Sequence, residues 1–292
     1  MAQPPICDYD GSDYQLSFWE EGGRVYEDRV EAVALARLLP PRGKLLLEIG
    51  AGAGRNTPRY QNFERVVLLD YSLTQLQQAQ ERLGRSERFI YVSADAYRLP
   101  FSPGLFDTAT MIRTLHHMAD VPRVLNQVHQ ALQPRAIFIL EYANKRNLKA
   151  MLRFWFGIQS WNPFDLEPVE FAKLNFDFHP CRIREWLSQS RFFLERQLAV
   201  SYFRLEILKR FVPISLLVAM DGLAQWTGKW WQFSPSVFVR ARAVGDSELA
   251  PPGAFFRCLQ CDASPLEEQA DRVICPSCGS QWQIKDGIYV FR

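Results

Sequence analysis

The sequence predicts an α/β protein with a mostly parallel sheet of seven strands, helices on both faces, and a small module after it that folds around a metal. Three observations lead to this prediction. Short apolar runs alternate with segments of helical spacing, a glycine-rich turn follows the first such run, and two Cys-x-x-Cys pairs stand late in the chain. With 292 residues, 48% of them hydrophobic, the chain is long enough for one full domain and a smaller one.

The first half of the chain supplies five parallel strands in a βαβ rhythm. Residues 25–39 have the spacing of an amphipathic helix, and 44–49 is a leucine-rich run typical of a strand buried on both faces. A helix over 121–132 is expected to begin at Asp120 as its N-cap. The other expected elements here are strands at 65–70, 88–93, 105–112 and 136–142 and a helix at 73–83.

The section 145–234 is less regular and unusually rich in Trp and Phe. Two further strands in and after it bring the expected sheet to seven. The expected elements are a helix near 182–190, an apolar and partly helical stretch at 205–231, and strands at 192–203 and 237–244.

The chain is expected to form two units joined by a linker. Residues 247–255 contain adjacent prolines and interrupt the pattern of strands and helices. We therefore expect one domain over 1–246 and a separate module over 256–292.

A glycine-rich turn at 50–54, Gly-Ala-Gly-Ala-Gly, directly follows the strand at 44–49. Such a turn lets the backbone pass close to a ligand and aims N–H groups at it. Dinucleotide-binding folds need Gly-x-Gly-x-x-Gly, but Arg55 stands at the third glycine position, which weakens a hydride-transfer interpretation.

Three acidic residues mark the ends of three consecutive strands. Glu48 stands two residues before the first glycine, where a carboxylate suits the ammonium of an amino acid. Asp70 ends the second strand, where it can accept hydrogen bonds from both hydroxyls of a ribose, and Asp95 follows the third, near the place of an adenine. Because parallel strands end at one edge of a sheet, these side chains predict a site for a nucleoside that carries an amino acid.

These motifs resemble those of the class I S-adenosylmethionine-dependent methyltransferases, which have a Rossmann-like fold, and among them the type 11 group that includes quinone-pathway methyltransferases. The resemblance covers roughly 25–244 and is strongest over 45–60. The motifs that follow in order are 66–72, 94–96 with 99–101, 106–107 and Leu115-His116-His117. It implies a methyltransferase (EC 2.1.1.-) with S-adenosylmethionine as its cofactor. The cofactor-binding residues that it implies are Glu48, Gly50, Ala51, Gly52, Asp70, Tyr71, Asp95, Ala96 and Arg113.

Methyl transfer by direct displacement needs a nucleophile held close to the sulfonium methyl in a dry pocket. His117, after the fourth strand, is the first candidate for touching the acceptor, and His179 is the second. A structural role for the His-His pair and an ordinary packed turn at His179 are the alternatives. In related enzymes the segment before the first helix often closes over the cofactor, and Tyr14, Phe18 and Trp19 stand there.

The acceptor region of this class follows the fifth strand, and here it is aromatic, which indicates an apolar or aromatic small-molecule acceptor. RNA (tRNA or rRNA) is an alternative acceptor, although the basic residues are scattered and the net charge is only +2. A catalytically silent scaffold or activating subunit is a third interpretation. The stretch 205–231 would pack as a core helix, form a pocket wall or lie on a membrane surface. Its longest apolar run, 211–220, is about half of the roughly 20 residues needed to cross a bilayer. The basic residues considered for RNA are Arg146, Lys149, Arg153, Lys209 and Arg210.

Four cysteines near the end of the sequence have the spacing of a zinc site. The two Cys-x-x-Cys pairs are separated by 13 residues, which lets four thiolates surround one Zn²⁺ tetrahedrally without an open position. Residues 256–292 resemble small zinc-ribbon proteins that activate tRNA and protein methyltransferases, and ribbons fused to some rRNA methyltransferases. The expected ligands of this structural zinc are Cys258, Cys261, Cys275 and Cys278.

A reducing compartment suits these cysteines, since the other two, Cys7 and Cys181, stand far apart in the sequence. The first 13 residues lack the basic start and apolar run of a signal peptide. We therefore expect a cytoplasmic protein.

Overall fold

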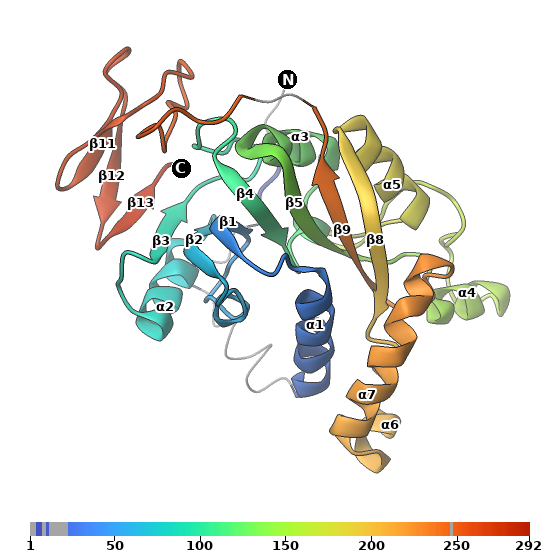
Figure 1. Ribbon diagram of the computed structural model, residues 1–292. Coiled ribbons are helices and arrows are strands. Elements are labelled where there is room, and N and C mark those ends of the chain that lie inside the picture. Colours follow the sequence, from blue (N-terminus) through green and yellow to red (C-terminus); the bar gives the residue numbers. More distant parts are fainter. Residues whose placement is uncertain (1–3, 8–9, 12–22, 246–247) are drawn as a thin grey trace.

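One continuous sheet runs through the molecule, with helices on both of its faces (Figure 1).

The residues Tyr14, Phe18 and Trp19, which are expected to cover the cofactor, lie outside the residues that the structure describes. The computed structural model describes residues 4–7, 10–11, 23–245 and 248–292.

The seven strands expected from the sequence are all present. They are β1 (Gly43–Ile49), β2 (Phe63–Asp70), β3 (Phe89–Ser93), β4 (Phe106–Met111), β5 (Leu132–Ala143), β8 (Phe192–Val200) and β9 (Ser236–Ala243). Parallel pairing joins β3, β2, β1, β4 and β5 in that spatial order, and β9 then pairs antiparallel with both β5 and β8. The predicted mostly parallel α/β fold is therefore confirmed.

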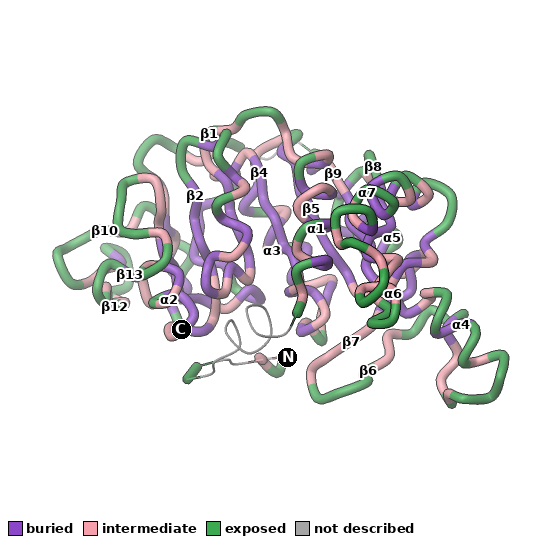
Figure 2. Tube along the Cα trace, turned by 90° about the horizontal axis from the view of Figure 1, so that it is seen from below, coloured by how far each residue is buried: buried purple, intermediate pink, exposed green. Residues whose placement is uncertain are grey.

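Successive side chains of the central strands point to opposite faces of the sheet, and helices cover both faces. These strands are therefore apolar throughout. Leu46 is aligned across the sheet with Ile137 through Thr108, whereas Leu47 is aligned with Phe138 through Ala109. The first side packs against α1 (Val25–Leu38), α2 (Leu73–Leu83) and α7 (Ile214–Ala224), and the second against α3 (Val121–Ala131) and α5 (Pro180–Gln189). In Figure 2 the buried strands form the middle of the molecule.

The helices α2 and α3 both begin at residues whose side chains cap them. The Ser72 hydroxyl accepts a hydrogen bond from the Gln75 N–H at the start of α2, and the Asp120 carboxylate accepts one from the Arg123 N–H at the start of α3. Each cap satisfies an N–H group that has no partner within its helix. The N-cap predicted at Asp120 is confirmed.

The apolar stretch 205–231 is divided into α6 (Glu206–Phe211), α7 and the 3₁₀ turn η4 (Gln225–Lys229). Pro213 stands at the N-cap of α7, where its missing N–H costs nothing. The buried side of α7 lies against α1, where the Tyr26 hydroxyl donates to the Asp221 carboxylate at 2.7 Å. The opposite side exposes Leu216, Met220 and Leu223.

A small insert lies between β5 and α5 at one end of the sheet. It consists of α4 (Leu148–Trp155) and the hairpin of β6 (Val169–Ala172) and β7 (Asn175–Asp177). Figure 2 shows it at the margin of the molecule, mostly exposed or half-buried. The insert joins the sheet through Phe178, whose N–H donates to the Ala143 carbonyl at the end of β5.

The continuous sheet has eleven strands, more than the seven that we predicted. The additional strands belong to the cysteine-containing module, and β13 pairs in parallel with β3, matching Ile288 to Tyr91 and Val290 to Ser93. The module therefore extends the main sheet and covers the edge of β3 that would otherwise be unpaired. The division of the chain at 247–255 stays a prediction. The four added strands are β10 (Glu267–Glu268), β11 (Arg272–Ile274), β12 (Gln281–Lys285) and β13 (Ile288–Val290).

Candidate cofactor site and metal centre

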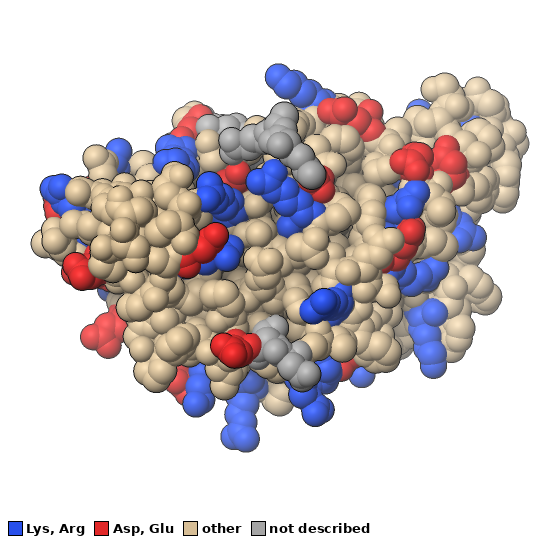
Figure 3. All heavy atoms as spheres, turned by 90° about the horizontal axis from the view of Figure 1, so that it is seen from above, with Lys and Arg blue, Asp and Glu red and all other residues tan. Residues whose placement is uncertain are grey.

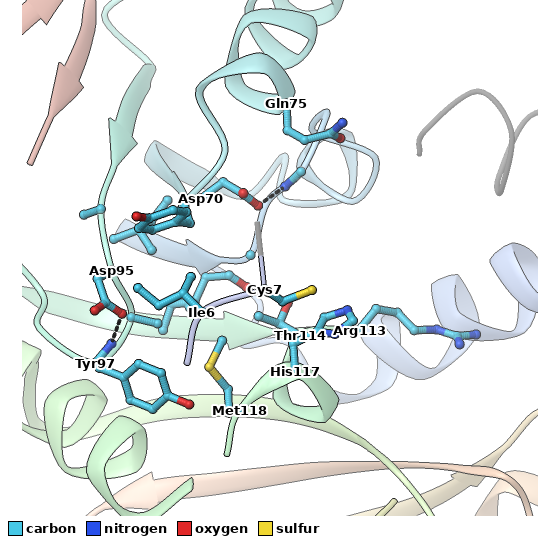
Figure 4. Close-up of a pocket in the computed structure, with 17 residues that line it drawn as sticks. Ile6, Cys7, Asp70, Gln75, Asp95, Tyr97, Arg113, Thr114, His117 and Met118 are labelled. Atoms are coloured by element: carbon cyan, nitrogen blue, oxygen red, sulfur yellow. Dashed lines mark hydrogen bonds between the residues drawn. The ribbon is translucent and has the colours of Figure 1, made fainter. Parts of the chain in front are cut away.

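The carboxyl ends of β1, β2, β3 and β4 meet at one edge of the sheet and line a pocket there (Figure 4). The parallel pairing brings these ends together. Glu48 and Ala51, among the described residues, lie outside its lining. The other residues predicted to bind the cofactor all line it: Gly50, Gly52, Asp70, Tyr71, Asp95, Ala96 and Arg113.

The turn after β1 requires glycine at its first position. Gly50 has a φ of +70°, and a Cβ added there would lie 2.0 Å from the Thr114 hydroxyl oxygen. That hydroxyl donates to the Ile49 carbonyl, and the Gly50 N–H donates to the Leu69 carbonyl at 2.8 Å. The turn is therefore fixed against β2 and against the chain beyond β4, with its backbone at the pocket wall.

Asp70 holds the turn with the same carboxylate that faces the pocket. Its Oδ2 accepts the Gly52 N–H at 2.8 Å, and its Oδ1 accepts the Ser72 N–H at 2.9 Å. Burial raises the pKa of Asp70, against the lowering effect of these backbone hydrogen bonds. Each carboxylate oxygen has a second lone pair, so the group can hold the backbone and still accept ligand hydroxyls.

The wall beyond β3 is formed by Asp95, Ala96 and Tyr97. The Asp95 carboxylate accepts the Tyr97 N–H at 2.8 Å, and the buried Tyr97 hydroxyl accepts the Ala119 N–H before α3. In Figure 4 Asp95 and Asp70 enter the site from neighbouring strands. Both acids therefore line the same pocket, one after β2 and one after β3.

Glu48 lies beneath the pocket wall in a buried polar network. The Thr57 hydroxyl donates to Glu48 Oε2 at 2.6 Å, and the Tyr60 hydroxyl lies 3.4 Å from Oε1 and 3.1 Å from Thr110. Burial raises the pKa of Glu48 to about 7, although Thr57 and the nearby Arg55 lower it. The carboxyl group thus has a protonation equilibrium near neutral pH.

Arg113 lines the pocket but its guanidinium is bound by Glu31 of α1. The Arg113 Nη2 atom lies 2.6 Å from Glu31 Oε1, and the Arg55 Nη2 atom lies 2.8 Å from Glu31 Oε2. Burial alone would raise the pKa of Glu31, but the two guanidiniums outweigh it and hold the pKa at about 2. Arg113 also has a φ of 60°, a rarely populated backbone conformation for a residue with a side chain. Its N–H donates to the Glu141 carboxylate at 3.0 Å.

His117 lies at the pocket in the 3₁₀ turn η3 (Leu115–His117). Its Nδ1 lies 2.9 Å from the Leu174 carbonyl oxygen in the β6–β7 turn, so this nitrogen must carry the proton and Nε2 the lone pair. Burial lowers the pKa of His117, which keeps the ring neutral at pH 7. The neighbouring His116 ring lies 3.9 Å away between centroids.

His179, the second candidate, lies outside the pocket lining among the described residues. It is the N-cap of α5, where its Nδ1 accepts the Cys181 N–H at 3.2 Å. Burial and the nearby Arg146 and Lys145 lower the pKa of His179 to about 4, so the ring accepts this bond as a neutral group. In this structure His179 caps α5, and its candidate role at the acceptor stays a prediction.

Several residues of the site could not be predicted from the sequence. Ile6 and Cys7 line the pocket, yet they come from a stretch without periodic pattern, so no signal placed them there. Glu31 had a signal, because it is an acid on the helix face that also carries the buried Tyr26 and Ala34. An acid on the apolar face of a helix predicts a buried cationic partner.

The four predicted metal ligands converge in the module. The sulfur atoms of Cys258, Cys261, Cys275 and Cys278 all lie within 4.8 Å of one another, and none of these cysteines is in a disulfide. The Cys258 and Cys278 sulfurs are 3.5 Å apart, close to the separation that a tetrahedral thiolate site with bonds of about 2.3 Å requires. The Gln260 N–H donates to the Cys258 sulfur, which suits a thiolate. The donor set fits a metal ion.

Comparison with known proteins identifies the core of the chain. Residues 47–140 match the family model described as a methyltransferase domain. This segment is a methyltransferase domain. The match covers the glycine turn, Asp70, Asp95 and His117, and it ends within β5.

Curated relatives resemble only part of the chain. An O-methyltransferase from Penicillium expansum, cnsE, is 29% identical over 145 residues, which are 46% of this chain and 52% of the relative. A 2-phytyl-1,4-naphthoquinone methyltransferase from Nostoc punctiforme is 37% identical over 131 residues, 42% of this chain and 55% of the relative. The chain therefore spans about half the length of these curated relatives.

A solved structure shares the fold of most of this chain. A complex between a Haloferax volcanii methyltransferase activator and a methyltransferase matches with a TM-score of 0.56 at 14% identity, covering 80% of this chain and 96% of the solved chain. Similarity at this level of identity establishes the fold. Within the described residues, no helix has both the length and the apolar character to cross a membrane.

Proposed function

We propose that the protein is an S-adenosylmethionine-dependent methyltransferase that methylates an apolar or aromatic small molecule. One observation carries the proposal: a single pocket joins a glycine turn, carboxylates at the ends of β2 and β3, and a neutral histidine. The glycine turn and the two carboxylates suit a cationic nucleoside cofactor, and the histidine suits a methyl acceptor that must lose a proton.

The cofactor would lie across the strand ends. Asp70 would accept the ribose hydroxyls, and Asp95 and Ala96 would face the adenine, beyond Tyr71. The methionine part would lie over Gly50 and Gly52, with Ala51, Glu48 and Arg113 as the further predicted partners. Arg113 would meet the carboxylate while it remains bound to Glu31.

His117 would serve the acceptor. Its neutral ring, fixed by the Leu174 carbonyl, presents Nε2 as a proton acceptor for a hydroxyl that becomes the methylated oxygen. The same bond joins the cofactor pocket to the β6–β7 hairpin, so the acceptor would lie between the pocket and the aromatic insert. The named activities of the relatives, an O-methyltransferase and a naphthoquinone methyltransferase, are in keeping with a small-molecule acceptor.

RNA is supported less well. On the face seen in Figure 3, Lys and Arg side chains are dispersed among acidic and uncharged ones and form no continuous stripe. Lys209, one of the basic residues considered for RNA, is bound to Glu27 at 2.9 Å and to Glu206 at 3.2 Å. A silent scaffold is supported less well too, because it would not need to keep the residues of a charged ligand site.

We propose a structural zinc in the module and a cytoplasmic location, because four clustered thiolates need a reducing compartment to stay available for a metal.

The test is transfer of a labelled methyl group from S-adenosylmethionine into host-cell extract, separated into small-molecule, lipid, RNA and protein fractions. We expect label in the small-molecule or lipid fraction, and less of it with the Asp70→Ala variant. Label in RNA alone would contradict the proposed acceptor class. Binding of S-adenosylhomocysteine without label in any fraction would identify a silent scaffold.

A further inference from the structure

The cysteine-containing module reaches the cofactor edge through the strand that it adds to the sheet. Because β13 runs parallel to β3, the residue after β13 emerges at the same edge as Asp95 after β3. The Phe291 N–H donates to the Ser93 carbonyl at 2.7 Å, which extends the pairing to the last residue of β3. Arg292 therefore comes out beside the cofactor pocket, although its sequence position is 197 residues beyond Asp95.

Arg292 contacts Tyr71, which lines the pocket next to Asp70. Its Nη1 atom donates to the Tyr71 carbonyl at 3.3 Å, and its guanidinium lies 5.3 Å from the centre of the Tyr71 ring. The Ser93 hydroxyl donates to the same carbonyl at 3.0 Å. Tyr71 is thus held from the module on one side and from β3 on the other.

The same guanidinium binds Asp10, 2.6 Å away, in the segment formed by the described residues 4–7 and 10–11. Asp10 in turn accepts hydrogen bonds from the Ser72 hydroxyl at 2.9 Å and the Thr74 N–H at 3.2 Å. Arg292 therefore links the module to this segment at the start of α2, and residues 6 and 7 of the segment line the pocket.

These contacts are modest one by one. The Arg292 side chain is 24% exposed and that of Asp10 is 32% exposed, so water screens their attraction. Their effect on binding comes from their position. They hold Tyr71 and the 4–7 and 10–11 segment in place, so a cofactor that binds has less of the pocket wall to order.

We propose that Arg292 is a positioning residue for the cofactor. The metal-loaded module, paired to β3 through β13, holds Tyr71 and the 4–7 and 10–11 segment against the nucleoside side of the pocket. Cofactor affinity is thereby coupled to the metal in a module that does not itself line the site. This inference rests on the proposed function for the identity of the ligand.

Calorimetry with S-adenosylhomocysteine on the full chain tests the coupling. Arg292→Ala is expected to weaken binding by about three- to tenfold, and Arg292→Lys by less, since it keeps the charge. The matched control is Arg272→Ala, which removes an exposed arginine paired with Asp271 elsewhere in the module. Zinc content, measured on every variant, should stay the same, which separates positioning from loss of the folded module.

Two further measurements test the route of the coupling. Asp10→Asn should weaken binding, and the double variant should be no weaker than the worse single variant, because Asp10 and Arg292 act through one contact. Stripping the metal with a chelator should weaken binding at least as much as Arg292→Ala, with recovery on adding Zn²⁺.

The outcomes separate the two proposals. If the wild-type protein binds S-adenosylhomocysteine and Arg292→Ala binds it equally well, the coupling is wrong while the proposed function stands. Additive effects of Asp10→Asn and Arg292→Ala would also overturn the coupling. If the wild-type protein does not bind this ligand, the proposed function fails and the inference falls with it.

Discussion

Replacing Glu48 by Gln should stabilise the cofactor-free protein in a pH-dependent way. Glu48 is 4% exposed, and burial raises its pKa from 4.5 to about 7. The folded state therefore holds a proton that the unfolded state releases above pH 4.5. A carboxyl with a raised pKa supports folding fully below pH 4.5 and loses that support as the pH rises through 7.

The magnitude follows from the same numbers. At about 1.4 kcal/mol for each pH unit between 4.5 and about 7, the penalty for burying the charged carboxylate reaches about 3 kcal/mol above pH 7. Gln has nearly the same shape and carries no charge. Its amide oxygen can accept the Thr57 hydroxyl, and its NH₂ group can donate to the Tyr60 hydroxyl oxygen, so the network is kept.

Urea unfolding at several pH values between 5 and 8 measures this effect. The Glu48→Gln variant should exceed the wild type in free energy of unfolding by about 3 kcal/mol at pH 8, and the gain should shrink towards pH 5. Glu81→Gln, at an exposed position of α2, controls for the loss of one negative charge. A gain that does not vary with pH would refute the reasoning.

Three other changes have expected outcomes. Asp70→Ala should weaken S-adenosylhomocysteine binding by about 1 to 3 kcal/mol through loss of ribose hydrogen bonds and of the brace on Gly52, and unchanged affinity in calorimetry would contradict the assignment. Elemental analysis should find one zinc per wild-type chain and none in Cys275→Ser, whose module should become sensitive to protease; wild-type protein without metal would refute the site. Tyr26→Phe should lower the free energy of unfolding by about 2 kcal/mol, because the Asp221 carboxylate and the Phe203 N–H both lose a buried partner; urea denaturation with no change would show that water replaces the hydroxyl.

The sheet and the acids at its edge could be read from the sequence because they follow local rules. A leucine-rich run before a glycine turn predicts β1, since a strand covered on both faces must be apolar throughout. Strands in parallel end at one edge, so Asp70 and Asp95 could be brought together from their places in the chain alone.

Contacts between residues that lie far apart in the sequence could not be predicted from it. Glu31 meets Arg55 and Arg113 only after α1 has packed against the sheet, and helical spacing does not name the partners of a buried acid. The partner of β13 was equally hidden. Its short apolar run fits several edges, and only the open side of β3 determines that the module joins the sheet there.

The sequence also could not distinguish the roles of His117 and His179. His117 follows β4 and His179 follows β7, and both suited a catalytic role by residue type. What separates them is the direction of a single hydrogen bond. The Nδ1 of His117 faces a carbonyl and must donate, whereas that of His179 faces an N–H and must accept.

The way the module closes the sheet also bears on how the protein would fail. An unpaired strand at the edge of a sheet is a template on which another chain can add, and aggregation follows. With the module in place, the sheet ends on this side in β10, a strand of two glutamates that is too short and too acidic for such growth. Loss of the metal would free the edge of β3, so metal-depleted protein should be lost from solution as aggregates before its methyltransferase domain unfolds.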